Sequence, residues 1–308
     1  MAEGGKRVAV IDVGTNSTRL LVADVEGGRV SPVERRSTVT RLGRGVDLSG
    51  HLAHEAIEDV CTAIGGYVGI LQELGAETVD AIATSAVRDA DNGSAFIAEL
   101  RERFALSARV LDGEEEARST YLGATSEHTP TEPTLVIDIG GGSTEMVVGT
   151  GSEISFHDSL QAGVVRHTER CIASDPPTAG ELEALATDVR GLILASVGED
   201  ATAAHGIAVA GTPTSLAAVE MALEPYDPSR VHGHVLALPS IQRMLSQLAS
   251  APLAERVEIP GLHPDRAPTI VAGVVILVEA MRAFGLEEIT VSEHDILYGT
   301  ALAAVALP

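Results

Sequence analysis

A chain of 308 residues is long enough for two domains of ordinary size, and its 45% apolar content can fill a sizeable core. Its net charge of −23 argues against nucleic-acid binding, and no apolar stretch is long enough to cross a membrane, the longest being 271–278. Asp12 interrupts the first apolar run, which excludes a signal peptide, and Cys61 and Cys171 show no disulfide or metal spacing, so a cytoplasmic protein is expected.

The first part of the chain is predicted to open with three antiparallel strands, followed by alternating helices and strands. Gly27-Gly28 is typical of a hairpin turn, and a long helical pattern ends at Gly75. The predicted strands are 8–11, 20–25, 29–40, 79–83 and 108–111, and the predicted helices are 52–74, 93–104 and 114–126.

The polar, proline-bearing segment 127–133 is the predicted linker, and the strand-rich opening repeats after it. This repetition predicts duplicated α/β domains at 1–126 and 127–308, with a closing helix in 293–308 that can pack back on the first domain. The predicted strands are 135–138, 145–149, 153–159, 207–210 and 289–291; the predicted helices are 164–171, 178–196, 214–223, 239–250, 265–283 and 295–305; segment 225–239 is predicted to be a loop.

Two glycine-rich loops stand out, DVGTNSTRL from Asp12 and DIGGGSTE from Asp138. Each lies between two apolar runs and therefore predicts a strand, a tight turn and a second strand. Backbone without Cβ atoms can approach an anion closely and direct N–H groups at phosphate oxygens. One such turn is equally consistent with an ordinary hairpin. Two of them, each led by an aspartate, predict a duplicated fold that holds a phosphate chain between its halves.

These loops resemble the phosphate loops of the superfamily of actin, sugar kinases and heat-shock-chaperone ATPases. Their amino-acid sequences resemble those of the exopolyphosphatase and guanosine-pentaphosphatase (Ppx/GppA) branch, and the resemblance covers nearly the whole chain. It implies duplicated actin-like (ribonuclease-H-like) domains with a cleft between them. Further matching blocks lie at 84–92, 113–118, 163–170 and 210–212. Segment 293–299 departs from the branch's usual GLREG-like turn, because it lacks the arginine and the glutamate.

Three residues are expected to be catalytic, and the resemblance supplies the role of the first. Glu116 corresponds to the catalytic glutamate of the GxEEA block and is expected to point inward as the general base. Glu145 is expected to help position the water, and Arg88 to contact the transferred phosphoryl group. Composition alone favours a different interpretation of Glu116, as part of the acidic first turn of a helix, and it leaves a surface ion pair as an equal alternative for Arg88.

Asp12 and Asp138 end equivalent strands and are expected to hold Mg²⁺ (or Mn²⁺), although a turn aspartate also caps its own loop. Arg166, with His167 and Arg170 on one predicted helical face, either guides a long polyphosphate or is simply solvated. The expected substrate-binding residues are Gly14, Thr15, Asn16, Ser17, Arg19, Gly140, Gly141, Gly142, Ser143, Thr144, Arg166 and Gly211.

The resulting hypothesis is a phosphoanhydride hydrolase, an exopolyphosphatase that removes terminal phosphate from inorganic polyphosphate, with a preference for short chains. The alternatives are a guanosine-pentaphosphate (pppGpp) 5′-phosphohydrolase, a sugar kinase and a non-catalytic polyphosphate or alarmone sensor. A homodimer is expected, without nucleic-acid or membrane partners. His232 and His234 are weak evidence for a metal, because no third ligand has suitable spacing.

Overall fold

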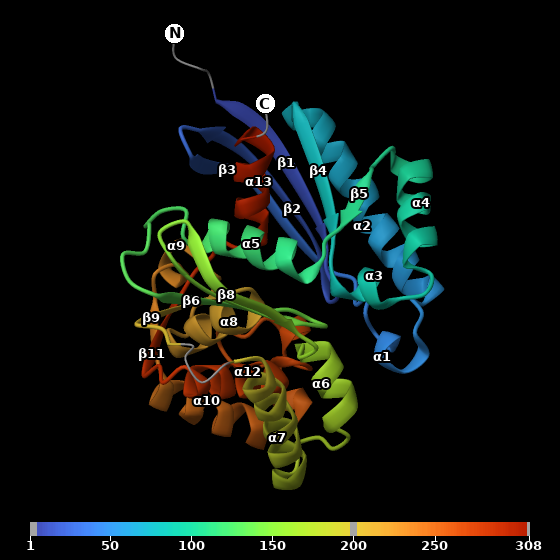
Figure 1. The fold of residues 1–308 in the computed structure, drawn as a ribbon. Helices are drawn as coiled ribbons and strands as arrows, with labels where there is room; N and C mark the ends of the chain where they lie inside the picture. Colours follow the sequence, from blue (N-terminus) through green and yellow to red (C-terminus); the bar gives the residue numbers. More distant parts are fainter. Residues whose placement is uncertain (1–4, 198–201, 307–308) are drawn as a thin grey trace. The chain divides into compact units, whose positions relative to one another are not determined.

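The computed structural model describes residues 5–197 and 202–306, and the chain divides into two compact units (Figure 1). Unit 1 consists of Met1–His128 together with His294–Pro308, and unit 2 of Thr129–Glu293. The last helix therefore belongs to unit 1, although it follows all of unit 2 in the sequence. No helix in the described part of the chain is long and apolar enough to span a membrane.

Unit 1 is built on a five-stranded sheet in the order β3-β2-β1-β4-β5. The first three strands are antiparallel, and β4 and β5 continue the sheet parallel to β1. The strands are β1 (Lys6–Val13), β2 (Ser17–Glu26), β3 (Arg29–Val39), β4 (Thr78–Ala83) and β5 (Ala108–Val110); the helices are α1 (Val46–Ser49), α2 (His54–Leu74), α3 (Ser85–Asp89), α4 (Gly93–Phe104), α5 (Gly113–Ala124) and α13 (Ile296–Ala306).

Helices cover both faces of this sheet, because β1 is apolar on both of its sides. Alternate β1 residues such as Ala9 and Ile11 pack in the same cluster as the buried stripe of α2. The intervening residues Val8 and Val10 pack with Leu297 and other residues of α13. In Figure 1, α2 and α13 accordingly flank the strands of unit 1 from different sides.

Unit 2 is built on a six-stranded sheet in the order β10-β11-β9-β6-β7-β8. Helix α12 is buried along its length, from Ile270 to Met281, and forms the centre of the core. The strands are β6 (Thr134–Ile139), β7 (Thr144–Thr150), β8 (Glu153–Leu160), β9 (His205–Val209), β10 (Val235–Ala237) and β11 (Glu288–Val291); the helices are α6 (Val164–Cys171), α7 (Ala179–Ser196), α8 (Gly211–Glu220), α9 (Pro228–Val231), α10 (Leu238–Ser250), α11 (Leu253–Arg256), the 3₁₀ helix η1 (Pro264–Arg266) and α12 (Ile270–Ala283).

The predicted duplicated α/β fold is confirmed, since each unit opens with an antiparallel three-strand meander and continues with parallel strands. The predicted loop 225–239 is wrong: it contains α9 and the edge strand β10, whose three residues are too few for a recognisable alternation. The predicted helix 265–283 begins later, at Ile270, because Pro268 has no N–H for a continuous helical ladder.

Candidate active site

The first glycine-rich loop joins β1 to β2 and is closed by a hydrogen bond from the Gly14 N–H to the Ser17 carbonyl, at 3.1 Å. The Thr15 hydroxyl lies 2.8 Å from the Ser85 hydroxyl and accepts the Ala86 N–H at 3.2 Å. Thr15 therefore ties the loop to the start of α3. Its side chain is already engaged inside unit 1.

Three buried polar atoms of this loop have no hydrogen-bond partner among the described residues: Asp12 Oδ1, Asn16 Nδ2 and Ser17 Oγ. Buried polar atoms without partners are rare in folded proteins, because each one forfeits its hydration. The set contains one anionic acceptor and two donors. A cation suits the acceptor, and phosphate oxygens suit the donors.

Arg19 lies across the strand pair from Asp12 and holds it tightly. Its Nε and Nη2 donate to Asp12 Oδ2 at 2.9 and 2.6 Å, and its Nη1 donates to Asp295 Oδ2. Burial raises the pKa of Asp12 above its ordinary value; Arg19 opposes this shift, and Asp295 adds to it. Arg19 thus points from β2 toward two buried carboxylates.

Glu116 is positioned by the first turn of α5, where Asp112 and Glu115 form a reciprocal capping box. This cap uses the Glu115 carboxylate, which is half exposed, and leaves Glu116 on the buried side of the helix. Arg88 Nη1 donates to Glu116 Oε2 at 2.9 Å and to the Leu111 carbonyl at 2.8 Å. The inward direction expected for Glu116 is confirmed, and Arg88 forms an ion pair with its carboxylate.

The second loop joins β6 to β7 and is held through its carbonyl groups. The Gly140 and Gly141 carbonyls accept the N–H groups of Val164 and Val165 at 3.0 and 2.9 Å, and the Gly142 carbonyl accepts Arg166 Nε at 2.8 Å. In a trans peptide the C=O and the following N–H point in opposite directions.

The N–H groups of Gly141, Gly142 and Ser143 are therefore turned away from α6. None of the three donates a hydrogen bond to another group in the described part of the chain. Successive N–H groups with one orientation form an anion-binding concavity. The Thr144 hydroxyl, in contrast, donates to the Ala162 carbonyl and helps to hold the loop.

Asp138 and Glu145 lie directly opposite each other on β6 and β7, and both are buried. Ser159 Oγ donates to Glu145 Oε1 at 2.8 Å. Like charges in directly opposed positions destabilise a sheet. A divalent cation between carboxylate oxygens removes this repulsion, so the pair fits such an ion.

The predicted basic face of α6 is wrong for His167, whose side chain is fully buried. Its Nε2 lies 3.2 Å from Asp188 Oδ2 without hydrogen-bond geometry, and burial lowers the pKa of its imidazole. Arg170 Nη1 is 3.5 Å from the same carboxylate. Arg166 turns back to the second loop, so the three residues do not form one exposed surface.

Gly211 begins α8, after Ala210, which has a positive φ of 69°. A Cβ atom on Gly211 would lie 2.6 Å from Cζ of Arg266, so glycine allows this guanidinium to pack on the helix start. Sequence reasoning missed Arg266, Asp295 and Ser159. Ser159 was detectable from the predicted register of β7 and β8, but nothing local marks the other two.

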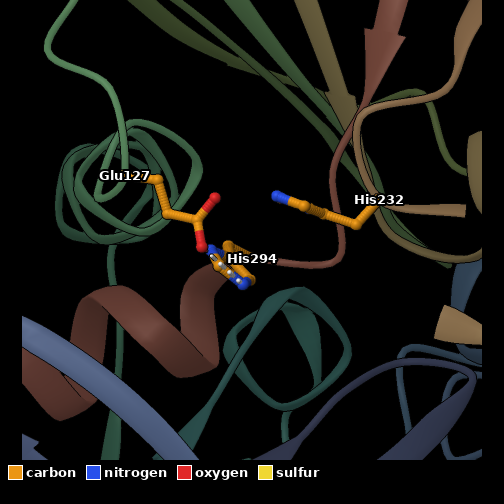
Figure 2. Close-up of side chains that lie close together, drawn as sticks. All are labelled: Glu127, His232 and His294. Carbon is orange, nitrogen blue, oxygen red and sulfur yellow. Dashed lines mark ion pairs between the residues drawn. The ribbon is translucent and has the colours of Figure 1, made fainter. Parts of the chain in front are cut away.

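The histidines have separate local partners. His232 Nδ1 accepts the Glu293 N–H at 3.1 Å, and His234 Nε2 lies 2.7 Å from a carboxylate oxygen of Glu220. In Figure 2, the Glu127 carboxylate and the His294 ring, both of unit 1, point toward each other, with His294 Nε2 4.0 Å from Glu127 Oε1. These contacts leave the role of His232 and His234 as open as the sequence did.

Comparison with known proteins identifies one family, described as the Ppx/GppA phosphatase family, which matches residues 21–303. The match includes Arg88, Glu116 and the second loop, whereas the first loop precedes it. Exopolyphosphatase 2 of Mycobacterium tuberculosis is 37% identical over 314 residues, covering 96% of this chain and 98% of that protein.

Two solved structures cover almost the whole chain as well. The Ppx/GppA family member of Aquifex aeolicus has 31% identity and a TM-score of 0.82, with 98% of both chains covered. An exopolyphosphatase from Cytophaga hutchinsonii has 25% identity and a TM-score of 0.90, covering 98% of this chain and 99% of that one.

Proposed function

Because this chain belongs to the Ppx/GppA phosphatase family, we propose that it is a cytoplasmic exopolyphosphatase, which hydrolyses the terminal phosphoanhydride of inorganic polyphosphate and releases orthophosphate. The observation that carries this proposal is the set of unsatisfied polar groups in the two loops. The first loop offers Asn16 Nδ2 and Ser17 Oγ, and the second offers three aligned N–H groups. Both sets are hydrogen-bond donors suited to phosphate oxygens.

Phosphate binding in this proposal uses two kinds of donor. Asn16 and Ser17 bind through their side chains, and Gly141, Gly142 and Ser143 bind through their backbone N–H groups. Five other residues contribute by shaping the backbone. The hydroxyl groups of Thr15 and Thr144 are used in contacts within the protein, and the lack of a Cβ atom at Gly14, Gly140 and Gly211 allows neighbouring groups to approach closely. Arg19 supplies a cationic contact on the first loop.

A divalent cation, Mg²⁺ or Mn²⁺, fits the carboxylates of this chain. Asp138 and Glu145 oppose each other, and Asp12 keeps Oδ1 without a hydrogen-bond partner among the described residues. Oxygen ligands of this kind suit Mg²⁺, and the bound ion would offset the negative charge of the phosphates. We propose Asp138 and Asp12 as ligands and Glu145 as a residue that orients the water.

The chemical step needs a nucleophile in line with the scissile bond. We propose that Glu116 accepts the proton of a water molecule as the water oxygen bonds to the terminal phosphorus, while the bridging P–O bond breaks. Arg88 pairs with Glu116 at 2.9 Å and would place positive charge near the transferred group. The shortened polyphosphate leaves with the bridging oxygen.

The test is phosphate release from polyphosphates of defined length, with and without Mg²⁺, and from pppGpp in competition. We expect release that requires the cation and is more efficient for short chains, because His167 adds nothing to an outer basic surface. Intermediate lengths should accumulate during partial digestion. Hydrolysis of pppGpp alone would replace the substrate assignment, and binding without release would make the protein a sensor. The expected homodimer stays a prediction.

A further inference from the structure

Asp295 directly precedes α13 and contacts the first loop through Arg19. We propose that Asp295 sets the substrate affinity by competing with phosphate for the Arg19 guanidinium. The inference rests on the proposed function, because it takes the ligand to be a phosphate chain. Asp295 acts through Arg19 and is therefore a positioning residue.

The burial of the three side chains separates their roles. The side chains of Asp12 and Asp295 are 3% and 5% exposed, whereas that of Arg19 is 20% exposed. A ligand arriving from solvent therefore reaches the guanidinium more easily than either carboxylate. Asp295 draws Nη1 inward, and a phosphate oxygen that binds this nitrogen must displace a charge-assisted hydrogen bond.

Asp295 is itself held rigidly. Its Oδ1 accepts the Leu297 N–H at 3.0 Å at the start of α13. Helices α5 and α13 touch through glycines: a Cβ on Gly123 would lie 2.0 Å from the Asp295 carbonyl oxygen. Asp295 therefore has a fixed position relative to Arg19 and to the helix that carries Glu116. A fixed anion is a stronger competitor than a mobile one, because it loses no side-chain entropy when it binds the guanidinium.

Charge among these residues leads to the same expectation. Two carboxylates and one guanidinium sum to −1, so these three side chains by themselves repel a polyanion although they include an arginine. Replacing Asp295 by asparagine removes one negative charge and weakens the hold on Nη1, while an amide oxygen still accepts the Leu297 N–H. The expected result is tighter phosphate binding, which a merely damaged fold would not produce.

The experiment is a double-mutant cycle with Asp295→Asn and Arg19→Gln. It measures calorimetric binding of a methylene-linked triphosphate analogue with Mg²⁺, and the KM for tripolyphosphate. We expect Asp295→Asn to tighten binding and lower KM by roughly 5- to 20-fold when Arg19 is present, and by less than about twofold in the Arg19→Gln background. The control Asp227→Asn changes a helix cap in unit 2, where Ser229 donates at 3.0 Å, and should leave both values unchanged.

If Asp295→Asn tightened binding equally with and without Arg19, Asp295 would act only as a long-range charge, and the inference would be overturned. Unchanged or weaker binding in Asp295→Asn would overturn it as well. Thermal unfolding checks the fold of each variant; Asp295→Ser, which retains a capping oxygen, replaces the asparagine variant if that one is unfolded. Failure of the proposed function is a separate result, because wild-type protein would then neither bind the analogue nor release phosphate from tripolyphosphate.

Discussion

The two glycine-rich loops share a backbone plan but differ in what they keep available. In both, the N–H of the first glycine bonds the carbonyl of the serine three residues later, at 3.1 and 3.0 Å. In the first loop, the buried side-chain atoms without a partner among the described residues belong to Asp12, Asn16 and Ser17, whereas the second loop keeps the backbone N–H groups of Gly141, Gly142 and Ser143.

The residue opposite the leading aspartate also differs: Arg19 faces Asp12, but Glu145 faces Asp138. One duplicated element thus carries its own cation, and the other carries a pair of carboxylates that suits an added cation. The comparison teaches that two copies of one loop plan can present different polar groups, side-chain donors in one copy and backbone donors in the other.

The largest expected effect comes from Glu116, which lies outside both loops. Its substitution therefore tests the chemical step separately from phosphate binding. Glu116→Gln should lower kcat by roughly 10²–10⁴ with little change in KM, because the amide cannot accept the water's proton. Steady-state phosphate release measures both values. Glu114→Gln is the matched control, since Glu114 lies in the same helical turn but pairs with Arg118 at the surface. More than half the wild-type rate in Glu116→Gln would make Glu116 structural.

The next prediction concerns the second loop, which is held in place through its backbone carbonyl groups. A Cβ on Gly163 would lie 2.3 Å from the Gly141 carbonyl oxygen, so Gly163→Ala must displace the second loop. We expect kcat/KM to fall on the order of 10²-fold, because a shift of about 1 Å at a site is that costly. Activity near wild type would show that the position of this loop is unimportant.

The first loop provides the counterpart of that change. A Cβ on Gly43 would lie 2.2 Å from Cγ2 of Thr15, which is a side-chain methyl group. Gly43→Ala should therefore impair activity, and adding Thr15→Ser, which removes that methyl group, should restore most of it. Assays of the single and double variants check this rescue. If the double variant stays as impaired as the single one, the clash involves more than the threonine methyl.

A smaller effect is expected from removing either of two hydroxyl groups of the first loop, those of Ser17 and Thr15. Ser17→Ala removes a hydroxyl without a partner among the described residues, so KM should rise by about tenfold with no loss of stability. Thr15→Val breaks the contact with Ser85 and should cost about 1 kcal/mol of unfolding free energy. Urea unfolding and KM are measured for both. A clear destabilisation by Ser17→Ala would mean that its hydroxyl already has a structural role.

The smallest effect concerns α6, the helix that holds the second loop. Burial lowers the pKa of His167, so the folded protein favours neutral imidazole and the unfolded chain binds the proton more readily. The resulting stability is present above the ordinary pKa of about 6.5 and is lost as the pH falls below it.

His167→Leu should therefore reduce the loss of unfolding free energy between pH 7 and pH 5, by at most about 1.4 kcal/mol per pH unit. Urea unfolding at both values measures the difference. Asp188 and Arg170 are present in both the wild type and the variant, so the difference in pH dependence reports on His167. An identical pH dependence in the variant would indicate that protonated His167 is already accommodated through Asp188.

Local pattern was sufficient for much of the fold and for part of the site. Apolar runs around each loop predicted the strands, and helical spacing predicted α4 and α6 at the residues observed. The inward direction of Glu116 was expected from family resemblance, and its cap supplies the physical reason, since Asp112 and Glu115 satisfy each other's backbone groups. Such features depend on residues within a few positions, and the sequence therefore records them directly.

Tertiary structure alone decided which donors and acceptors are already taken. Arg19 meets Asp295 across 276 positions, and Arg166 meets the Gly142 carbonyl across 24. His167 is buried by packing between α6 and its neighbours, although its helical spacing resembles that of an exposed residue. The sequence does not show whether a polar side chain hydrogen-bonds within the protein or remains available to a ligand. The difference depends on partners that only folding brings within hydrogen-bond distance.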